Sequence, residues 1–362
     1  MPRCGDTARD DETARRHQRR ATAKPYGHFV KRGPGSRSGR TKISKEAQDK
    51  LELAIQNAWA EATLQKYGAS LDAFLGFCDR ENVPKHQRLP ADEFLLCAFA
   101  ASRAGEIAGS TARGAIAAVK AWHVVHDADW NGGLRLRYTL RGVENLAPSS
   151  SKRDERPPVT AEMLDILERE LDHTDPKDAA VFAAACCAFW GQARLGELLS
   201  NAQGSWKQGR IPLGSDLKPP GTRAGSRILR LPYTKTKGAR GEDAMLCRQR
   251  GPSDPIRALA SHVAINDVQP DLPLFAHRNR RGDLVCLTRR KFLDRCNEVW
   301  ARNGIPTRTG HSFRIGGTTE LLLAGVNPDV VQAMGRWKSD AFKVYWRRLD
   351  LLAPLHAEYI GV

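Results

Sequence analysis

Residues 179–190 are the feature of this sequence that most restricts its fold. They form an unbroken apolar run that ends in Phe189-Trp190. A helix that is apolar on nearly every side is stable only when other elements cover it, so the run predicts a helix buried inside a larger domain. The run falls well short of the roughly 20 residues that would cross a bilayer.

The preceding region, residues 44–147, has the spacing of a helical bundle. One stripe recurs at steps of three and four residues, as on one face of an amphipathic helix: Leu64, Tyr67, Leu71, Phe74 and Cys78. Further helices are predicted from Pro90 onward, from about Ser110 as an N-cap, and near residues 138–146. A polar linker, residues 148–158, then separates this bundle of about four helices from the second domain.

Residues 159–362 combine helices with a small hairpin. Thr160 is predicted to cap one helix, and Asn327, followed by Pro328, is predicted to cap another. Apolar residues alternate with others over 229–233, and residues 244–247 can return as a second strand after a glycine-containing turn. A further helix is expected over 312–323. The fold class predicted for the whole chain is mainly α with a small β-sheet or hairpin.

Half of the net positive charge lies in the first eighth of the chain. The 362 residues include 57 Lys and Arg against 41 Asp and Glu, a net charge of +16, and residues 1–42 supply +8 of it. Because this segment has few large aliphatic residues, we expect residues 1–43 to be a disordered basic arm. Contact with DNA phosphates, nuclear import and simple solubilisation are the roles open to it.

The charge makes a polyanion the expected partner, with nucleic acid preferred over a membrane surface. The eight cysteines show no CxxC pair and no Cys/His spacing typical of zinc, and the chain has no GxxxxGK loop. The sequence therefore predicts an intracellular protein with reduced thiols, no metal and no small-molecule cofactor. We expect it in the nucleus if the host is eukaryotic, and otherwise in the cytoplasm with DNA.

Two segments of the second domain place arginine where it could meet an anion. Arg194 precedes Glu197 by three residues, so the two share one helical face, and a structural ion pair is the plain alternative. His311 and Arg314 also lie three residues apart, near a predicted helix N-terminus whose dipole favours an anion such as phosphate. Alone, each of these patterns is common.

Two more segments carry reactive side chains. Lys235 and Lys237 lie at the predicted hairpin tip, where an exposed basic turn is the alternative interpretation. Arg336 and Trp337 follow Gly335, and Tyr345 comes nine residues after Arg336. Tyr345 could equally be a core tyrosine, because it shares one helical face with Phe342.

The order and spacing of these segments are more specific than any one of them. An arginine, a hairpin lysine, a His-x-x-Arg motif and a tyrosine 31 residues after the second arginine resemble the catalytic set of the tyrosine recombinases, the phage-type integrases. By this resemblance, residues 44–147 are a helical core-binding, SAM-like DNA-binding domain, and residues 159–362 are a mixed α+β catalytic domain. The string from Met334 to Phe342 is most similar to recombinases of eukaryotic DIRS, Ngaro and Crypton elements.

The resemblance implies a role for each residue. Tyr345 would be the nucleophile that forms a covalent 3′-phosphotyrosine, and Arg194 and Arg314 would clamp the scissile phosphate. Lys235 would protonate the departing 5′ oxygen, because its Thr-Lys-Thr context is similar to Cre-like enzymes, with Lys237 as the rival. His311 would bind the phosphate or act as a base.

Arg336 departs from the family pattern. Many members carry His or Trp at this position. Arg336 cannot act as a base but can donate to a phosphate oxygen, and Trp337 beside it offers stacking or an indole donor instead. The proton acceptor for Tyr345 is therefore left open.

The expected function is site-specific recombination or integration of double-stranded DNA, by four subunits on two duplexes, in an enzyme derived from a mobile element. Two alternatives stay open: a domesticated DNA-binding protein that no longer cuts, and a type IB topoisomerase-like enzyme. The apolar tail, residues 349–362, would pack on a neighbouring subunit or on its own domain.

Overall fold

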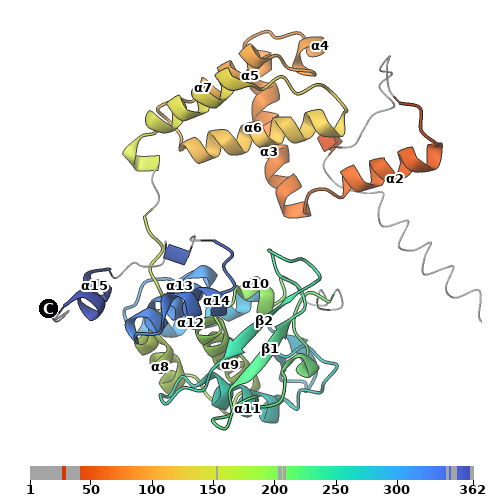
Figure 1. The fold of residues 1–362 in the computed structure, drawn as a ribbon. Helices are drawn as coiled ribbons and strands as arrows, with labels where there is room; N and C mark the ends of the chain where they lie inside the picture. The colour runs from red at the N-terminus through yellow and green to blue at the C-terminus, as the bar shows by residue number, and fades with distance from the viewer. Residues whose placement is uncertain are drawn as a thin grey trace, which may run out of the picture. The chain divides into compact units, whose positions relative to one another are not determined.

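The computed structural model describes residues 27–29, 41–151, 154–202, 206, 209–339, 342–343 and 349–358. The chain folds as two compact units, Met1–Asp154 and Glu155–Val362 (Figure 1). The boundary lies inside the polar stretch 148–158. The mainly helical fold class predicted from the sequence is confirmed, with two small antiparallel sheets in the second unit. No helix among the described residues is both long and apolar enough to cross a membrane.

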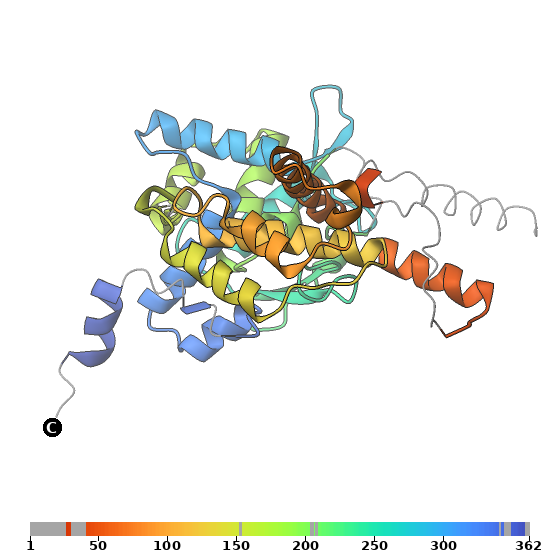
Figure 2. The same ribbon diagram turned by 90° about the horizontal axis from the view of Figure 1, so that it is seen from above.

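The first unit is a bundle of α-helices joined by short turns. Its helices are α2 (Lys45–Gln56), α3 (Glu61–Arg80), α4 (Lys85–Arg88), α5 (Glu93–Ala101), α6 (Gly109–Val125) and α7 (Leu134–Asn145). The predicted stripe of α3 supplies the core, where Phe74 meets Phe99 of α5 edge to face. Helix α3 packs across α6, while α2 extends away from the other helices of this unit in both views (Figures 1 and 2).

Two expectations for this unit need correction. Helix α6 begins at Gly109 after Ala108, so Ser110 lies inside the first turn and is not its cap. Part of the predicted disordered arm is also ordered, because Phe29 is buried against Tyr67 of α3 and His28 bonds Asp72. A large aromatic side chain gains enough by burial to hold this short piece of backbone on the helices. Apart from residues 27–29 and 41–43, the arm lies outside the described residues.

The second unit is built around α9, which is buried as the apolar run predicts. Every residue of α9 (Pro176–Trp190) from Asp178 to Phe189 is buried. The surrounding elements are α8 (Ala161–Glu170), α10 (Leu195–Leu198), β1 (Arg227–Leu231), β2 (Glu242–Leu246), α11 (Pro255–Asn266), β3 (Ala276–Arg278), β4 (Leu284–Cys286), α12 (Arg289–Arg302), α13 (Gly310–Leu323), α14 (Pro328–Met334) and α15 (Leu349–Ala357). The main packing partners of α9 are α11 and α13.

Local sequence explains several of these boundaries. The side chain of Thr160 caps α8 and that of Asn327 caps α14, as predicted. Strand β1 pairs antiparallel with β2 but ends at Leu231, two residues earlier than expected, because Pro232 has no N–H to donate to the ladder.

A glycine pair brings α13 against the centre of the unit. A Cβ at Gly317 would lie 1.9 Å from the carbonyl oxygen of Phe189, and one at Gly316 would lie 1.8 Å from that of Val159. Only glycine allows this approach, so the pair fixes α13, and with it Arg314, against the end of α9. Leu352 of α15 is buried with Leu321 of α13 and Val331 of α14, so this part of the tail packs on its own unit.

Candidate functional site

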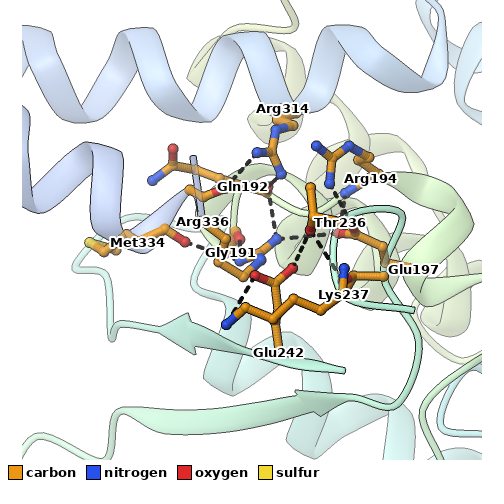
Figure 3. Close-up of polar contacts among 12 residues, drawn as sticks. Gly191, Gln192, Arg194, Glu197, Thr236, Lys237, Glu242, Arg314, Met334 and Arg336 are labelled. Carbon is orange, nitrogen blue, oxygen red and sulfur yellow. Dashed lines mark hydrogen bonds and ion pairs between the residues drawn. The ribbon is translucent and has the colours of Figure 1, made fainter. Parts of the chain in front are cut away.

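The site forms where α9 ends and the chain turns into α10. Arg194 immediately precedes α10, and the buried carboxylate of Glu197 accepts hydrogen bonds from the Arg194 backbone N–H at 3.0 Å and from its Nη1 at 2.7 Å. The pairing predicted from their spacing is therefore present (Figure 3). The Arg194 side chain keeps 29% of its surface exposed, so its guanidinium can still meet a ligand while Glu197 holds one edge of it.

Arg336 lies on the other side of Glu197 and faces inward. Its Nη2 donates to Glu197 Oε2 at 3.3 Å and to the carbonyl of Gln192 at 3.2 Å, while Nη1 donates to the carbonyls of Gly191 and Met334 (Figure 3). Only 6% of the side chain is exposed. Burial lowers the pKa of this guanidinium, and the carboxylates of Glu197 and Glu242 oppose that shift. The sequence predicted a donor to phosphate, whereas the structure commits Arg336 to acceptors within the protein.

Backbone geometry accounts for this inward position. Arg336 has a φ of 62°, in the left-handed region that side chains other than glycine rarely adopt. The turn after α14 therefore directs Arg336 toward Gln192, whose φ of 44° is also left-handed. Such strain persists only where surrounding contacts fix it, and here the contacts of the buried guanidinium do so.

Arg314 is completely buried beneath the same turn. Its Nη1 donates to the carbonyl of Gln192 at 2.6 Å and its Nη2 to the carbonyl of Gly335. The Trp337 ring covers the guanidinium, with 4.2 Å between the Arg314 Cζ and the ring centroid. Gly335 makes room for the indole, because a Cβ there would lie 1.6 Å from a ring atom of Trp337.

Arg194 and His311 line one hollow of about 460 Å³, which we call the Arg194 hollow. Its full lining is Arg194, Leu195, Gly196, Asn201, Arg289, Arg290, Leu293, Gly310 and His311. None of these residues is acidic. Arg289 was not anticipated from the sequence, and a Cβ at Gly196 would lie 3.1 Å from its Nη1. Burial lowers the pKa of Arg289, so an anion that entered this hollow would meet partly desolvated cations.

A second hollow, of about 380 Å³, lies under the β1–β2 turn, and we call it the hairpin hollow. Its lining is Arg230, Lys237, Gly241, Glu242, Asp243, Ala333, Arg336, Trp337 and Lys338. Lys237 Nζ lies 3.6 Å from Glu242 Oε1 (Figure 3). Lys235 is exposed in the turn and does not line this hollow. Of the two candidate lysines, the structure brings Lys237 to the Glu197–Arg336 network.

The remaining predicted residue, Tyr345, lies outside the described residues. The nearest described residue before it, Lys343, is exposed, and Phe342 is buried with its ring 6.2 Å from that of Trp337. The structure thus gathers Arg194, His311, Arg314, Arg336 and Lys237 around the end of α9. Among the described residues, no group of three or more His, Cys, Asp or Glu side chains is placed to hold a metal ion.

Comparison with solved structures identifies the fold. The XerH site-specific recombinase bound to a palindromic difH substrate, a post-cleavage complex, matches with a TM-score of 0.52 and 15% identity, over 86% of this chain and 84% of that one. The pre-cleavage XerH complex with difH matches at 0.47 and 15%, over 84% and 81%, and the XerA recombinase at 0.39 and 15%, over 88% and 100%. The first of these likenesses shows that the chain has a tyrosine-recombinase fold.

Comparisons of the sequence itself give no match. No protein-family model matches the chain, and no curated protein does. The candidate site therefore has to be interpreted from its own residues.

Proposed function

We propose that this chain is a site-specific DNA recombinase or integrase that cuts and rejoins strands through a covalent 3′-phosphotyrosine. One observation carries the proposal. Residues from two distant segments, Arg194 before α10 and the pair His311 and Arg314 of α13, converge at the end of α9 in a chain whose fold is like that of XerH. The Arg194 hollow has arginine and histidine in its wall and no carboxylate, which suits a phosphodiester.

The proposed partner is double-stranded DNA, and the proposed assembly is four subunits on two duplexes. The related XerH structures are bound to a DNA substrate, and this chain carries a net charge of +16. An origin in a mobile element of the DIRS, Ngaro or Crypton type rests on the Gly335-Arg336-Trp337 string followed by Tyr345. The basic arm would add affinity for DNA that depends on salt and not on sequence.

The covalent step assigns one task to each group. The Tyr345 oxygen attacks phosphorus, the P–O5′ bond breaks, and the 5′ oxygen leaves with a proton from a lysine. Arg194 and His311 hold the non-bridging oxygens and offset the charge that develops on them. His311 is also the candidate acceptor for the phenol proton. Because the bond energy is kept in the phosphotyrosine, the reaction needs neither ATP nor a metal.

Arg314 can bind the phosphate only after the turn that carries Trp337 moves away from it. Its guanidinium lies under Trp337 and bonds the Gly335 carbonyl, so a phosphate oxygen reaches it only when the turn at 335–337 shifts. The same turn leads along the chain to Tyr345. Delivery of the tyrosine and exposure of Arg314 are therefore coupled in this proposal. Arg336 supports the site from within, because it holds Glu197 and through it Arg194.

Lys237 is the better candidate for the general acid. Both lysines are exposed in the turn, but only Lys237 lines the hairpin hollow with Arg336. We expect Lys237→Ala to slow strand cleavage by about 100-fold, the usual scale for a lost general acid. Lys235→Ala should change the rate by less than about threefold and serves as the matched control. Cleavage rates in a single turnover test this, and the reverse order would assign the role to Lys235.

The decisive test of the function is a covalent adduct. The protein is incubated with a pool of nicked suicide duplexes of randomised core sequence, and protein-linked DNA is separated on a denaturing gel and sequenced. Wild type should give an adduct whose DNA shares a common site, and Tyr345→Phe should give none. DNA binding without an adduct would indicate the non-cutting DNA-binding protein. Relaxation of supercoiled plasmid without a preferred site would indicate a topoisomerase.

A further inference from the structure

A buried carboxylate lies beside the hairpin lysine, and the reaction outlined above does not use it. Glu242 is the first residue of β2 and pairs with Leu231 of β1. The turn before it is fixed by Gly241, whose φ is 62° and whose Cβ, if present, would lie 2.2 Å from the Leu231 carbonyl oxygen. Only 6% of the Glu242 side chain is exposed. The strand pair and the turn therefore hold this carboxylate at one place, under the hairpin.

The contacts of Glu242 are with residues of the hairpin turn. Its Oε2 accepts a hydrogen bond from Thr236 Oγ1 at 2.7 Å, and its Oε1 lies 3.6 Å from Lys237 Nζ (Figure 3). Burial raises the pKa of this carboxyl, but hydrogen bonds from Thr236 and Thr234 and the charges of Lys237 and Arg336 outweigh that effect. The pKa is therefore lower than usual. Glu242 is thus an anion at neutral pH, placed between the lysine and Arg336.

The next residue provides a natural contrast. Asp243 also lines the hairpin hollow, but it keeps 53% of its side chain exposed and pairs with Arg230 at 3.1 Å. An exposed pair of this kind contributes little. A buried carboxylate costs free energy unless it is paired, so the loss of all its partners would cost Glu242 more than the loss of Arg230 would cost Asp243. The two neighbouring acids therefore differ in burial and partner while sharing strand and charge.

We propose that Glu242 is a positioning residue for the general acid: its carboxylate holds the Lys237 ammonium group beside the reaction centre until the 5′ oxygen needs a proton. This inference rests on the proposed function. Lys237 is suited to such a handover because 46% of its side chain is exposed, so the long stem can swing while the carboxylate stays fixed. A separation of 3.6 Å is a loose pairing, which the lysine can leave without breaking a short hydrogen bond.

A purely structural role is the competing explanation. Glu242 also accepts the bond from Thr236, and loss of that bond alone could distort the hairpin. Glu242→Gln separates the two, because a glutamine oxygen still accepts from Thr236 while the charge beside Lys237 is lost. Thr236→Val does the opposite, since it removes the hydroxyl and leaves the carboxylate. Glu242→Asp keeps the charge on a shorter side chain.

The test compares two suicide substrates, one with an ordinary phosphate and one with a 5′-bridging phosphorothiolate, whose leaving group needs no proton. Glu242→Gln should cleave the ordinary substrate about tenfold more slowly than wild type and the phosphorothiolate at the wild-type rate. Glu242→Asp should recover most of the loss. Thr236→Val should stay within about threefold of wild type on both substrates.

Each outcome decides between the explanations. Equal loss of both substrates in Glu242→Gln, or a matching loss in Thr236→Val, would show a structural role and overturn the inference. An unchanged rate in Glu242→Gln on the ordinary substrate would overturn it too. The phosphorothiolate reaction also reports whether the variant is folded, because it needs every other group of the site. If wild type forms no adduct with either substrate, the proposed function fails instead.

Discussion

The two hollows on either side of the Glu197–Arg336 network are similar in size and both are rich in basic residues, but only one of them also has acidic residues in its wall. The Arg194 hollow has Arg194, Arg289, Arg290 and His311 in its wall and no acidic residue. The hairpin hollow has four basic residues as well, but Glu242 and Asp243 accompany them. Because the wall of the first hollow contains no acidic side chain, it presents a more positive surface to an anion than the second does. We infer that the first hollow binds phosphate and that the second stores a proton donor.

One buried guanidinium separates these tasks. Arg336 bonds Glu197, the partner of Arg194, and also lines the hairpin hollow beside Glu242. Arg336 therefore contacts residues of both hollows, but its guanidinium is too buried to bind a ligand in either of them. Substitutions in the Arg194 hollow should therefore weaken phosphate chemistry, those at Lys237 and Glu242 should affect proton transfer, and those at Arg336 should affect stability.

The largest effect is expected at Arg194. Arg194→Lys keeps a charge for Glu197 but loses the planar fork that can hold two oxygens, so adduct formation should fall by about 1,000-fold. The free energy of unfolding should change by less than about 1 kcal/mol, because the side chain is partly exposed. Single-turnover cleavage and urea denaturation measure the two quantities. A loss of stability that accounted for the loss of rate would contradict a role in phosphate binding.

Arg336 should show the reverse pattern. Arg336→Met leaves the buried Glu197 with one partner fewer, and the free energy of unfolding should fall by about 4 kcal/mol, the usual scale for a broken buried pair. Lys338→Met, an exposed residue of the same hollow, should change stability by less than about 0.5 kcal/mol. Urea denaturation of the full chain checks both. If Arg336→Met were fully stable but unable to form the adduct, Arg336 would belong with the phosphate-binding residues.

A buried histidine of α11 makes the fold less stable at low pH, and this limits the pH range in which the two hollows can be compared. His262 bonds the Leu274 carbonyl and Asn266, and burial lowers its pKa from 6.5 to about 4. Below about pH 6.5 the unfolded chain binds a proton at this histidine that the folded chain does not bind. The contribution of His262 to the free energy of unfolding is therefore full above about pH 6.5 and falls by about 3 kcal/mol as the pH is lowered to 4. Urea denaturation at pH 7, 5.5 and 4 tests this. His262→Gln should show a smaller decline over the same range.

The smallest effect is expected at Arg289. Its guanidinium lies against Gly196 in the wall of the Arg194 hollow, whereas its neighbour Arg290 is exposed and pairs with Asp294. Arg289→Gln should lower the salt dependence of duplex binding by about one unit of log affinity per log salt concentration, while Arg290→Gln should lower it less. Fluorescence anisotropy with a labelled duplex at several salt concentrations measures these slopes. Equal slopes in wild type and Arg289→Gln would remove Arg289 from the phosphate-binding wall.

Sequence reasoning was accurate where the signal is local. The caps at Thr160 and Asn327 depend on a few neighbouring residues, as does the pair of Arg194 and Glu197, three residues apart. The apolar run of α9 also predicted correctly that this helix is buried. Each of these features is set within one or two helical turns, where side-chain direction follows directly from spacing.

The rest of the site depends on distant parts of the chain. Arg336 and Glu197 are 139 residues apart, and their contact depends on a left-handed residue that no local pattern of the sequence indicated. Arg289 reaches the Arg194 hollow only because α12 starts beside Gly196. The sequence favoured Lys235 over Lys237 because of the Thr-Lys-Thr residues around it. The position of Lys237 depends instead on the carboxylate of Glu242 across the hairpin.

The division of labour between the hollows is tested most directly by one ratio, the rate of adduct formation on the phosphorothiolate substrate over that on the ordinary one. For Lys237→Ala this ratio should exceed that of wild type by about 100-fold, because the substituted leaving group needs no acid. For Arg194→Lys the ratio should equal that of wild type, since phosphate must still be held. A ratio that rises equally in both variants, or in neither, would contradict the account.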